Sequence, residues 1–251
     1  MKLKTHFTDL GLIEYGTAWN LQERLFNSII ALKKSGLTET DNYLLFCEHP
    51  HVYTLGKSGS ENNLLLDMIQ LQAKDASFFR TNRGGDITYH GPGQIVGYPI
   101  LNLEAIVKGA REYIEKMEEA IILTLAHYGL ASERLDGATG VWLDTDKPDK
   151  TRKICAIGVR TSHWVSMHGF AFNVNTNLQY FNYINPCGFT DKAVTSLSKE
   201  LGRDIETDEV KTVLADKLAA VYGLDLLKMP KSELGTTFEN TSSLVPPLTP
   251  P

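Results

Sequence analysis

The chain has 251 residues, of which 42% are apolar and 22% charged, so it can bury a full core as one large or two small domains. Its net charge of −5 lacks the basic excess that is typical of nucleic-acid-binding proteins. The longest nearly unbroken apolar stretch, residues 120–126, is too short to span a bilayer, and the N-terminus has no apolar segment of a secretory signal. Three cysteines without metal-type spacing indicate reduced thiols, so we expect a cytoplasmic protein that binds neither nucleic acid nor membrane.

Hydrophobic periodicity predicts three long helices. The first covers residues 17–35, with Thr17 as its cap and Gly36 at its end. The other two cover residues 110–128 and 208–222. A shorter helix is expected after Thr190, with Val194, Leu197 and Leu201 on its apolar side.

Runs rich in β-branched and aromatic residues predict strands between these helices. They cover residues 43–48, 52–55, 94–101, 153–160, 163–166 and 169–174. The last three are joined by short connections, which indicates antiparallel hairpins rather than crossovers through a helix. Because helices and strands come in blocks, the pattern predicts an α+β fold, with a largely antiparallel or mixed sheet flanked by helices.

The C-terminal end of the chain differs in composition from the rest. Residues 229–251 hold five of the ten prolines and show almost no apolar periodicity. We therefore expect a catalytic domain over residues 1–228 and a disordered tail over 229–251.

The usual phosphate and metal motifs are missing. Gly56-Lys57-Ser58 resembles the end of a phosphate-binding loop, but His51 stands where its first glycine should be. His49 and His51 could pair on a metal ion, yet no third ligand lies nearby in the sequence. We therefore predict no metal site and no cofactor.

The most unusual segment is residues 83–93, RGGDITYHGPG, with four glycines and a proline. Such a segment either lets the backbone approach a ligand closely or lets two strands cross tightly. Arg83, Thr88 and His90 add hydrogen-bond donors to it. An ordinary glycine-rich hairpin would explain the pattern equally well.

Two further residues are candidates for chemistry. Lys153 opens a predicted strand, where a lysine is usually a solvated residue that protects a sheet edge. Strand alternation places it on the same face as Cys155. Cys187 lies between Pro186 and Gly188 on a tight turn, which suits an exposed nucleophile, whereas Cys47 and Cys155 lie in apolar strands.

Taken together, these segments resemble the lipoyl(octanoyl) transferase family, which has the biotin/lipoate protein ligase fold. The resemblance rests on motifs that occur in the family's order over about residues 43–201. They are Glu48-His49-Pro50 with Thr54-Leu55-Gly56, Arg83–His90 with Gly91-Pro92-Gly93-Gln94, Gly140-Val141-Trp142, Lys153-Ile154 with Ile157-Gly158, His168-Gly169 with Asn173-Val174, and Asn185-Pro186-Cys187-Gly188.

The resemblance implies an acyltransferase that moves an octanoyl group from acyl carrier protein to a lysine amine. The acceptors would be lipoyl domains of 2-oxoacid dehydrogenase E2 subunits and the glycine-cleavage H protein. In the family, a cysteine at the Cys187 position carries the acyl group and a lysine at the Lys153 position forms a dyad with it. The residues implied to line the acyl site are Arg83, Gly84, Gly85, Asp86, Ile87, Thr88, Tyr89, His90, Ala156, Ile157, Gly158, Gly169, Phe170 and Ala171.

Phe170 and Phe172 stand where aliphatic residues are more usual in the family, which bears on the preferred length of the acyl chain.

Rival functions remain compatible with parts of the sequence. An ATP-dependent lipoate or biotin ligase of the same fold needs no cysteine nucleophile, so the Cys187 motif speaks against it. A non-catalytic module that binds lipoyl domains, and a cysteine hydrolase with His90 or His168 as base, are two more rival functions.

Overall fold

The computed structural model describes residues 2–37, 40–185 and 193–236. Within these residues, nine strands form a mixed sheet in the order β12-β1-β2-β6-β10-β9-β8-β7, with β11 paired to β9. The strands are β1 (Leu3–Leu12), β2 (Tyr43–Glu48), β6 (Gln94–Ile100), β7 (Glu133–Leu135), β8 (Ala138–Leu143), β9 (Arg152–Ser162), β10 (Val165–Asn173), β11 (Ala193–Val194) and β12 (Leu224–Lys228). The predicted α+β class with a mixed sheet is confirmed.

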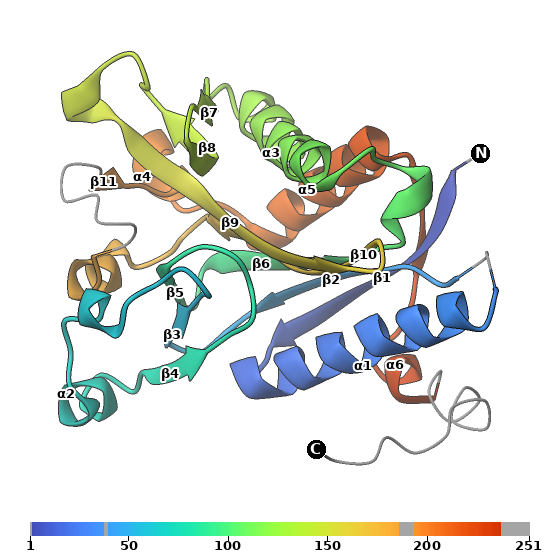
Figure 1. The fold of residues 1–251 in the computed structure, drawn as a ribbon. Coiled ribbons are helices and arrows are strands. Elements are labelled where there is room, and N and C mark those ends of the chain that lie inside the picture. The colour runs from blue at the N-terminus through green and yellow to red at the C-terminus, as the bar shows by residue number, and fades with distance from the viewer. Residues whose placement is uncertain (1, 38–39, 186–192, 237–251) are drawn as a thin grey trace.

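Long helices cover both faces of this sheet (Figure 1). Helix α1 (Tyr15–Lys34) packs on one face, and α3 (Ala110–His127) and α5 (Thr207–Tyr222) pack side by side on the other. The sheet therefore separates two apolar clusters, one beneath α1 and a larger one beneath α3 and α5. None of the helices in the described ranges combines the length and hydropathy that a membrane-spanning segment needs.

A smaller sheet lies beside the large one. It has the order β4-β3-β5, from β4 (Ser77–Arg80), β3 (Val52–Leu55) and β5 (Ile87–His90), and the short helix α2 (Met68–Gln72) precedes β4. Its own apolar cluster includes Tyr53 and Tyr89, which are both fully buried. The strand β5 leaves this small sheet and leads directly into β6 of the large one, so the two sheets meet at residues 90–94.

Several predicted elements differ from the structure at their ends. Helix α1 begins at Tyr15 rather than at Thr17, because the Ala18 N–H already bonds to the Glu14 carbonyl at 3.1 Å. The two strands expected over 163–166 and 169–174 form one strand, β10, which pairs with β9 from Val165 to Phe172. The turn between β9 and β10 is formed by His163 and Trp164, both at positive φ.

The chain after the cysteine motif also differs from the prediction. Val194 lies in strand β11 rather than in a helix, and helix α4 (Leu197–Leu201) begins only after Ser196, whose hydroxyl caps it. Thr190 and Cys187 lie outside the described residues. The helix therefore begins later in the chain than the apolar spacing alone indicated.

Residues after 228, where we expected the catalytic domain to end, still contact the rest of the fold. The Met229 N–H donates to the Phe7 carbonyl at 2.9 Å, and Lys231 donates to the Leu10 carbonyl at 3.2 Å. Leu234, in the last short helix α6 (Glu233–Thr236), is 2% exposed and belongs to the cluster beneath α1. Residues 237–251 of the predicted tail lie outside the described residues.

Candidate functional site

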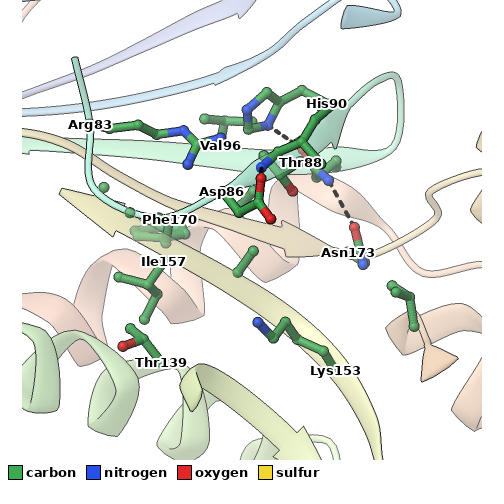
Figure 2. Close-up of a pocket in the computed structure, with 18 of the residues that line it drawn as sticks. Arg83, Asp86, Thr88, His90, Val96, Thr139, Lys153, Ile157, Phe170 and Asn173 are labelled. Atoms are coloured by element: carbon green, nitrogen blue, oxygen red, sulfur yellow. Dashed lines mark hydrogen bonds between the residues drawn. The ribbon is translucent and has the colours of Figure 1, made fainter. Parts of the chain in front are cut away.

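A cavity of about 450 Å³ lies where the two sheets meet. One wall is formed by residues 83–90 of the small sheet, and the other by strands β9 and β10 of the large sheet. The start of α1 and the β7–β8 turn close two further sides. Segments that are far apart in the sequence thus surround one space (Figure 2).

Most of the predicted acyl-site residues, and the predicted catalytic residue Lys153, line this cavity. They are Arg83, Gly85, Asp86, Ile87, Thr88, His90, Lys153, Ala156, Ile157, Gly158, Gly169, Phe170 and Ala171.

Gly84 and Tyr89 are predicted site residues that do not line the cavity. The Gly84 N–H donates to the Val159 carbonyl at 2.9 Å, which ties the glycine-rich loop to β9. Tyr89 points into the apolar cluster of the small sheet, where its ring stacks on that of Tyr180 at 5.0 Å. Gly84 and Tyr89 therefore lie behind the residues that line the cavity rather than among them.

Several lining residues were not predicted as site residues. They are Tyr15, Gln94, Val96, Tyr98, Gly137, Ala138, Thr139, Trp142, His168, Asn173, Phe181, Ala193 and Val194. Gln94, Trp142, His168 and Asn173 belong to the motifs quoted above, so the motifs contained a signal for them. Tyr15 and Thr139 carried none, because only the folded chain brings them to the cavity.

Lys153 extends from the beginning of β9 towards the cavity (Figure 2). Its Nζ lies 4.5 Å from the centre of the Trp142 ring, so the cation faces an aromatic surface. Val194 of β11 pairs with Lys153 in parallel register, and the Thr195 N–H donates to the Lys153 carbonyl at 2.9 Å. The described chain that follows the Cys187 segment therefore returns beside Lys153.

The two described cysteines are both fully buried. Burial is the main cause that raises the pKa of the Cys47 thiol and that of the Cys155 thiol. Neither lines the cavity, whereas Lys153, two residues before Cys155, does. The β8–β9 register shifts between Val141 and Trp142, beside these two residues, so the regular strand alternation is interrupted there.

Three histidines around the cavity are held neutral. Burial lowers the pKa of His49 to about 4 and that of His168 to about 3, and it lowers the pKa of His90 well below the ordinary value. Hydrogen bonds fix their tautomers: His49 Nδ1 donates to the Ile13 carbonyl at 2.7 Å, and His168 Nε2 donates to Asn82 Oδ1 at 2.6 Å. This wall is polar without carrying imidazolium charge.

Arg83 supplies a buried cation to the same wall. Its guanidinium donates to the Thr54 carbonyl at 2.6 Å and to the Gly84 carbonyl at 3.0 Å, and the residue is only 8% exposed. In Figure 2, Arg83 lies at the upper left and Lys153 below and right of centre, and Phe170 and Ile157 lie at heights between them. The lining of the cavity thus combines apolar side chains with two cationic groups.

The pair His49 and His51 forms no metal site in the structure. His49 turns towards Tyr98 at 2.7 Å, whereas His51 turns towards Tyr89 at 2.7 Å. Among the residues that the structure describes, no group of three or more His, Cys, Asp or Glu side chains is placed to hold a metal ion.

Comparison with known proteins identifies the family. Residues 14–219 match the model of the lipoyl protein ligase A/B catalytic domain. The octanoyltransferase of Bacteroides fragilis is 55% identical over 218 residues, which is 87% of this chain and 98% of that protein. The chain belongs to the octanoyltransferase family. This octanoyltransferase-family member is therefore an acyltransferase, as the sequence motifs predicted.

Further relatives agree on the family and the fold. The octanoyltransferase of Flavobacterium johnsoniae is 53% identical over 233 residues, which is 90% of this chain and 100% of that protein. The bipartite lipoate protein ligase of Thermoplasma acidophilum superposes with a TM-score of 0.70 at 15% identity, over 96% of this chain and 91% of that chain. This structural likeness confirms the predicted ligase-like fold.

Proposed function

We propose that the protein transfers an octanoyl group from the thioester of acyl carrier protein to a lysine amine through an acyl-thioester on Cys187. The acceptors would be lipoyl domains of 2-oxoacid dehydrogenase E2 subunits and the glycine-cleavage H protein. The observation that carries the proposal is the cavity with Lys153 at one end, in a chain that is 55% identical to an octanoyltransferase.

The cavity suits a medium-length acyl chain. Ile157, Phe170 and Val96 supply apolar surface to the cavity that Arg83 and Lys153 also line. Transferring the ~7 methylene and methyl groups of an octanoyl chain from water contributes roughly 6 kcal/mol, at about 0.8 kcal/mol each. That difference favours an octanoyl chain strongly over an acetyl group.

Burial of the other thiols supports Cys187 as the nucleophile. Only a thiolate attacks a thioester, and burial disfavours the thiolate of Cys47 and of Cys155. Cys187 lies in the segment that leads to β11, whose Val194 pairs with Lys153. The ammonium of Lys153 would favour a nearby thiolate.

The reaction balances without ATP. The Cys187 thiolate attacks the donor carbonyl, the bond from that carbonyl to the carrier sulfur breaks, and the carrier thiolate takes a proton from Lys153. The acceptor amine then attacks the Cys187 thioester, its C–S bond breaks, and the neutral Lys153 amine removes the proton from the nitrogen. The product amide is more stable than either thioester. Because this chemistry needs reduced thiols, we place the protein in the cytoplasm.

The decisive measurement is the intact mass of the protein after incubation with octanoyl-acyl carrier protein. The mass should rise by one octanoyl group in the wild type, in Cys47→Ala and in Cys155→Ala, but not in Cys187→Ala. Lys153→Arg keeps the charge that favours the Cys187 thiolate but does not readily release a proton, so some adduct should form and should then persist after acceptor is added.

Several outcomes would contradict the proposal. An adduct that persists in Cys187→Ala would remove the nucleophile, and transfer at the wild-type rate by Lys153→Arg would remove the proton transfer. The loss of a general base should lower the transfer rate roughly 10²–10⁴-fold. Product from free octanoate and ATP would instead indicate a ligase.

A further inference from the structure

A chain of buried hydrogen bonds runs from Arg83 across the cavity wall. Arg83 Nη2 lies 3.0 Å from Thr54 Oγ1, which lies 3.2 Å from His90 Nε2. On the other side of the imidazole ring, His90 Nδ1 lies 2.9 Å from Gln94 Oε1. Thr54 is fully buried and His90 is 7% exposed, so water does not compete for these bonds.

The chain continues from the small sheet into the large one. Gln94 Nε2 donates to Asn173 Oδ1 at 2.9 Å, and Figure 2 marks this bond with the dashed line that ends at Asn173. Asn173 Nδ2 then donates to the Thr195 carbonyl at 3.0 Å. Five hydrogen bonds therefore connect the guanidinium of Arg83 to the backbone of Thr195.

The chemistry of the two ends restricts the direction of the bonds. A guanidinium only donates, so Thr54 Oγ1 accepts from Arg83, and its own hydrogen remains available for His90 Nε2. At the other end a carbonyl only accepts, so Asn173 must present its Nδ2 to Thr195 and its Oδ1 to Gln94.

The same reasoning reaches His90 from the far side. Gln94 Nε2 must face Asn173, and it also donates to the Tyr89 carbonyl at 3.1 Å. Gln94 therefore presents its Oε1 to His90, whose Nδ1 must carry a proton. Burial keeps this imidazole neutral, so with the proton on Nδ1 its Nε2 accepts the hydrogen of Thr54 Oγ1, and a single arrangement of hydrogens makes all five bonds at once.

The far end of this chain lies beside Lys153. Thr195 donates its N–H to the Lys153 carbonyl at 2.9 Å, so the carbonyl held by Asn173 belongs to the residue that holds the Lys153 backbone. On its other side, Thr195 Oγ1 donates to Glu200 at 2.5 Å, and Glu200 accepts two bonds from Arg152. Thr195 is thus clamped from both sides.

We propose that Thr54, Gln94 and Asn173 are positioning residues, which hold the Lys153 backbone and the Ala193–Thr195 segment in register through this one-way hydrogen-bond chain. The inference rests on the proposed role of Lys153 in acyl transfer. None of the three needs to touch the reacting atoms. A misplacement of catalytic groups by 1 Å can lower the rate about 10²-fold, so loss of a remote link reaches the chemistry.

Thr54 offers a matched pair of variants. Thr54→Val keeps the shape but removes the hydroxyl, so His90 Nε2 loses its donor. Thr54→Ser keeps the hydroxyl but removes a methyl group from a fully buried site. We expect Val to lower kcat about 10–100-fold with KM within about threefold of wild type, and Ser to remain within about threefold in both.

The nitrogen-15 NMR shifts of His90 give a readout that does not depend on activity. In the wild type they should report a neutral ring with the proton on Nδ1 between pH 5 and 8. His49, Arg83, His168 and Tyr15 surround this ring, so Tyr15→Phe, which removes one facing hydroxyl, serves as a control that should leave the tautomer unchanged.

Each result decides the proposal. A Val variant with near-wild-type kcat, or Ser impaired as much as Val, would show that packing rather than the hydroxyl matters and would overturn it. A proton on Nε2 of His90 would also overturn it. If wild-type protein transfers no octanoyl group, the proposed function fails, whereas the NMR measurement still tests the chain itself.

Discussion

Phe170 offers a test of how the cavity selects chain length. Its ring lies in the cavity wall and covers Gly97, where an added Cβ would overlap the ring. It also packs edge-on against Phe46, with ring centres 6.0 Å apart. Replacing this phenyl ring by a leucine side chain should therefore open space on the apolar side of the cavity.

The magnitude follows from the atoms that are removed. Phe170→Leu deletes three carbon atoms, which gives room for about two more methylene groups of a bound chain. At about 0.8 kcal/mol for each methylene, a decanoyl chain gains roughly 1.6 kcal/mol, which is about a 15-fold shift in relative kcat/KM. The assay is competition between octanoyl and decanoyl carrier-protein thioesters for one acceptor.

Phe172→Leu is the matched control. Phe172 lies on the same strand, is fully buried and does not line the cavity. Both variants should lose about 2 kcal/mol of unfolding free energy, but only Phe170→Leu should change the substrate preference. An equal shift in both variants, or an unchanged preference in Phe170→Leu, would refute the assignment of Phe170 to the acyl-binding wall.

Two further predictions concern stability. His49 and His168 have pKa values of about 4 and about 3 in the folded protein, against an ordinary value of 6.5, so the unfolded chain binds more protons as the pH falls. As the pH falls from 6.5 towards these values, the unfolding free energy should therefore drop by about 1.4 kcal/mol per pH unit for each histidine. Urea titrations of His49→Asn at several pH values should show a slope of unfolding free energy against pH that is smaller by about one proton. Deleting residues 229–251 should cost about 2 kcal/mol because Leu234 is 2% exposed, whereas deleting 237–251 should change the unfolding free energy by no more than about 0.5 kcal/mol. Equal urea midpoints for the two truncations would contradict the packing of Leu234.

Much of the fold was readable because its periodicity is strong. The helices expected over 110–128 and 208–222 match α3 and α5 to within one residue at each end, and β2 and β3 match the predicted ranges. The strand β1 was missed because Thr5 and Thr8 interrupt its apolar pattern, although both are buried. Their hydroxyls bond to backbone carbonyls, a pairing that no local pattern predicts.

The site was readable in part for a different reason. The resemblance to a known family grouped the segments around Arg83, Gly158 and Gly169 before their contacts were known, and the structure brings them to one cavity. Tyr15 and Thr139 were missed, because they reach the cavity only through the docking of α1 and the β7–β8 turn. The contact of Leu234 was missed for the same reason.

The glycine-rich motif had two possible meanings, ligand approach or tight crossing, and the geometry joins them. A Cβ at Gly158 would lie 2.9 Å from the Gly84 carbonyl, and a Cβ at Gly169 would overlap the Gly97 carbonyl. The glycines are therefore needed first because backbone meets backbone. Since Gly158 also lines the cavity and Gly84 belongs to the loop of the facing wall, main-chain packing rather than side-chain rotamers sets the distance between the walls there. A wall of that kind cannot adjust to a longer ligand, which leaves side chains such as Phe170 to determine the length of the chain that fits.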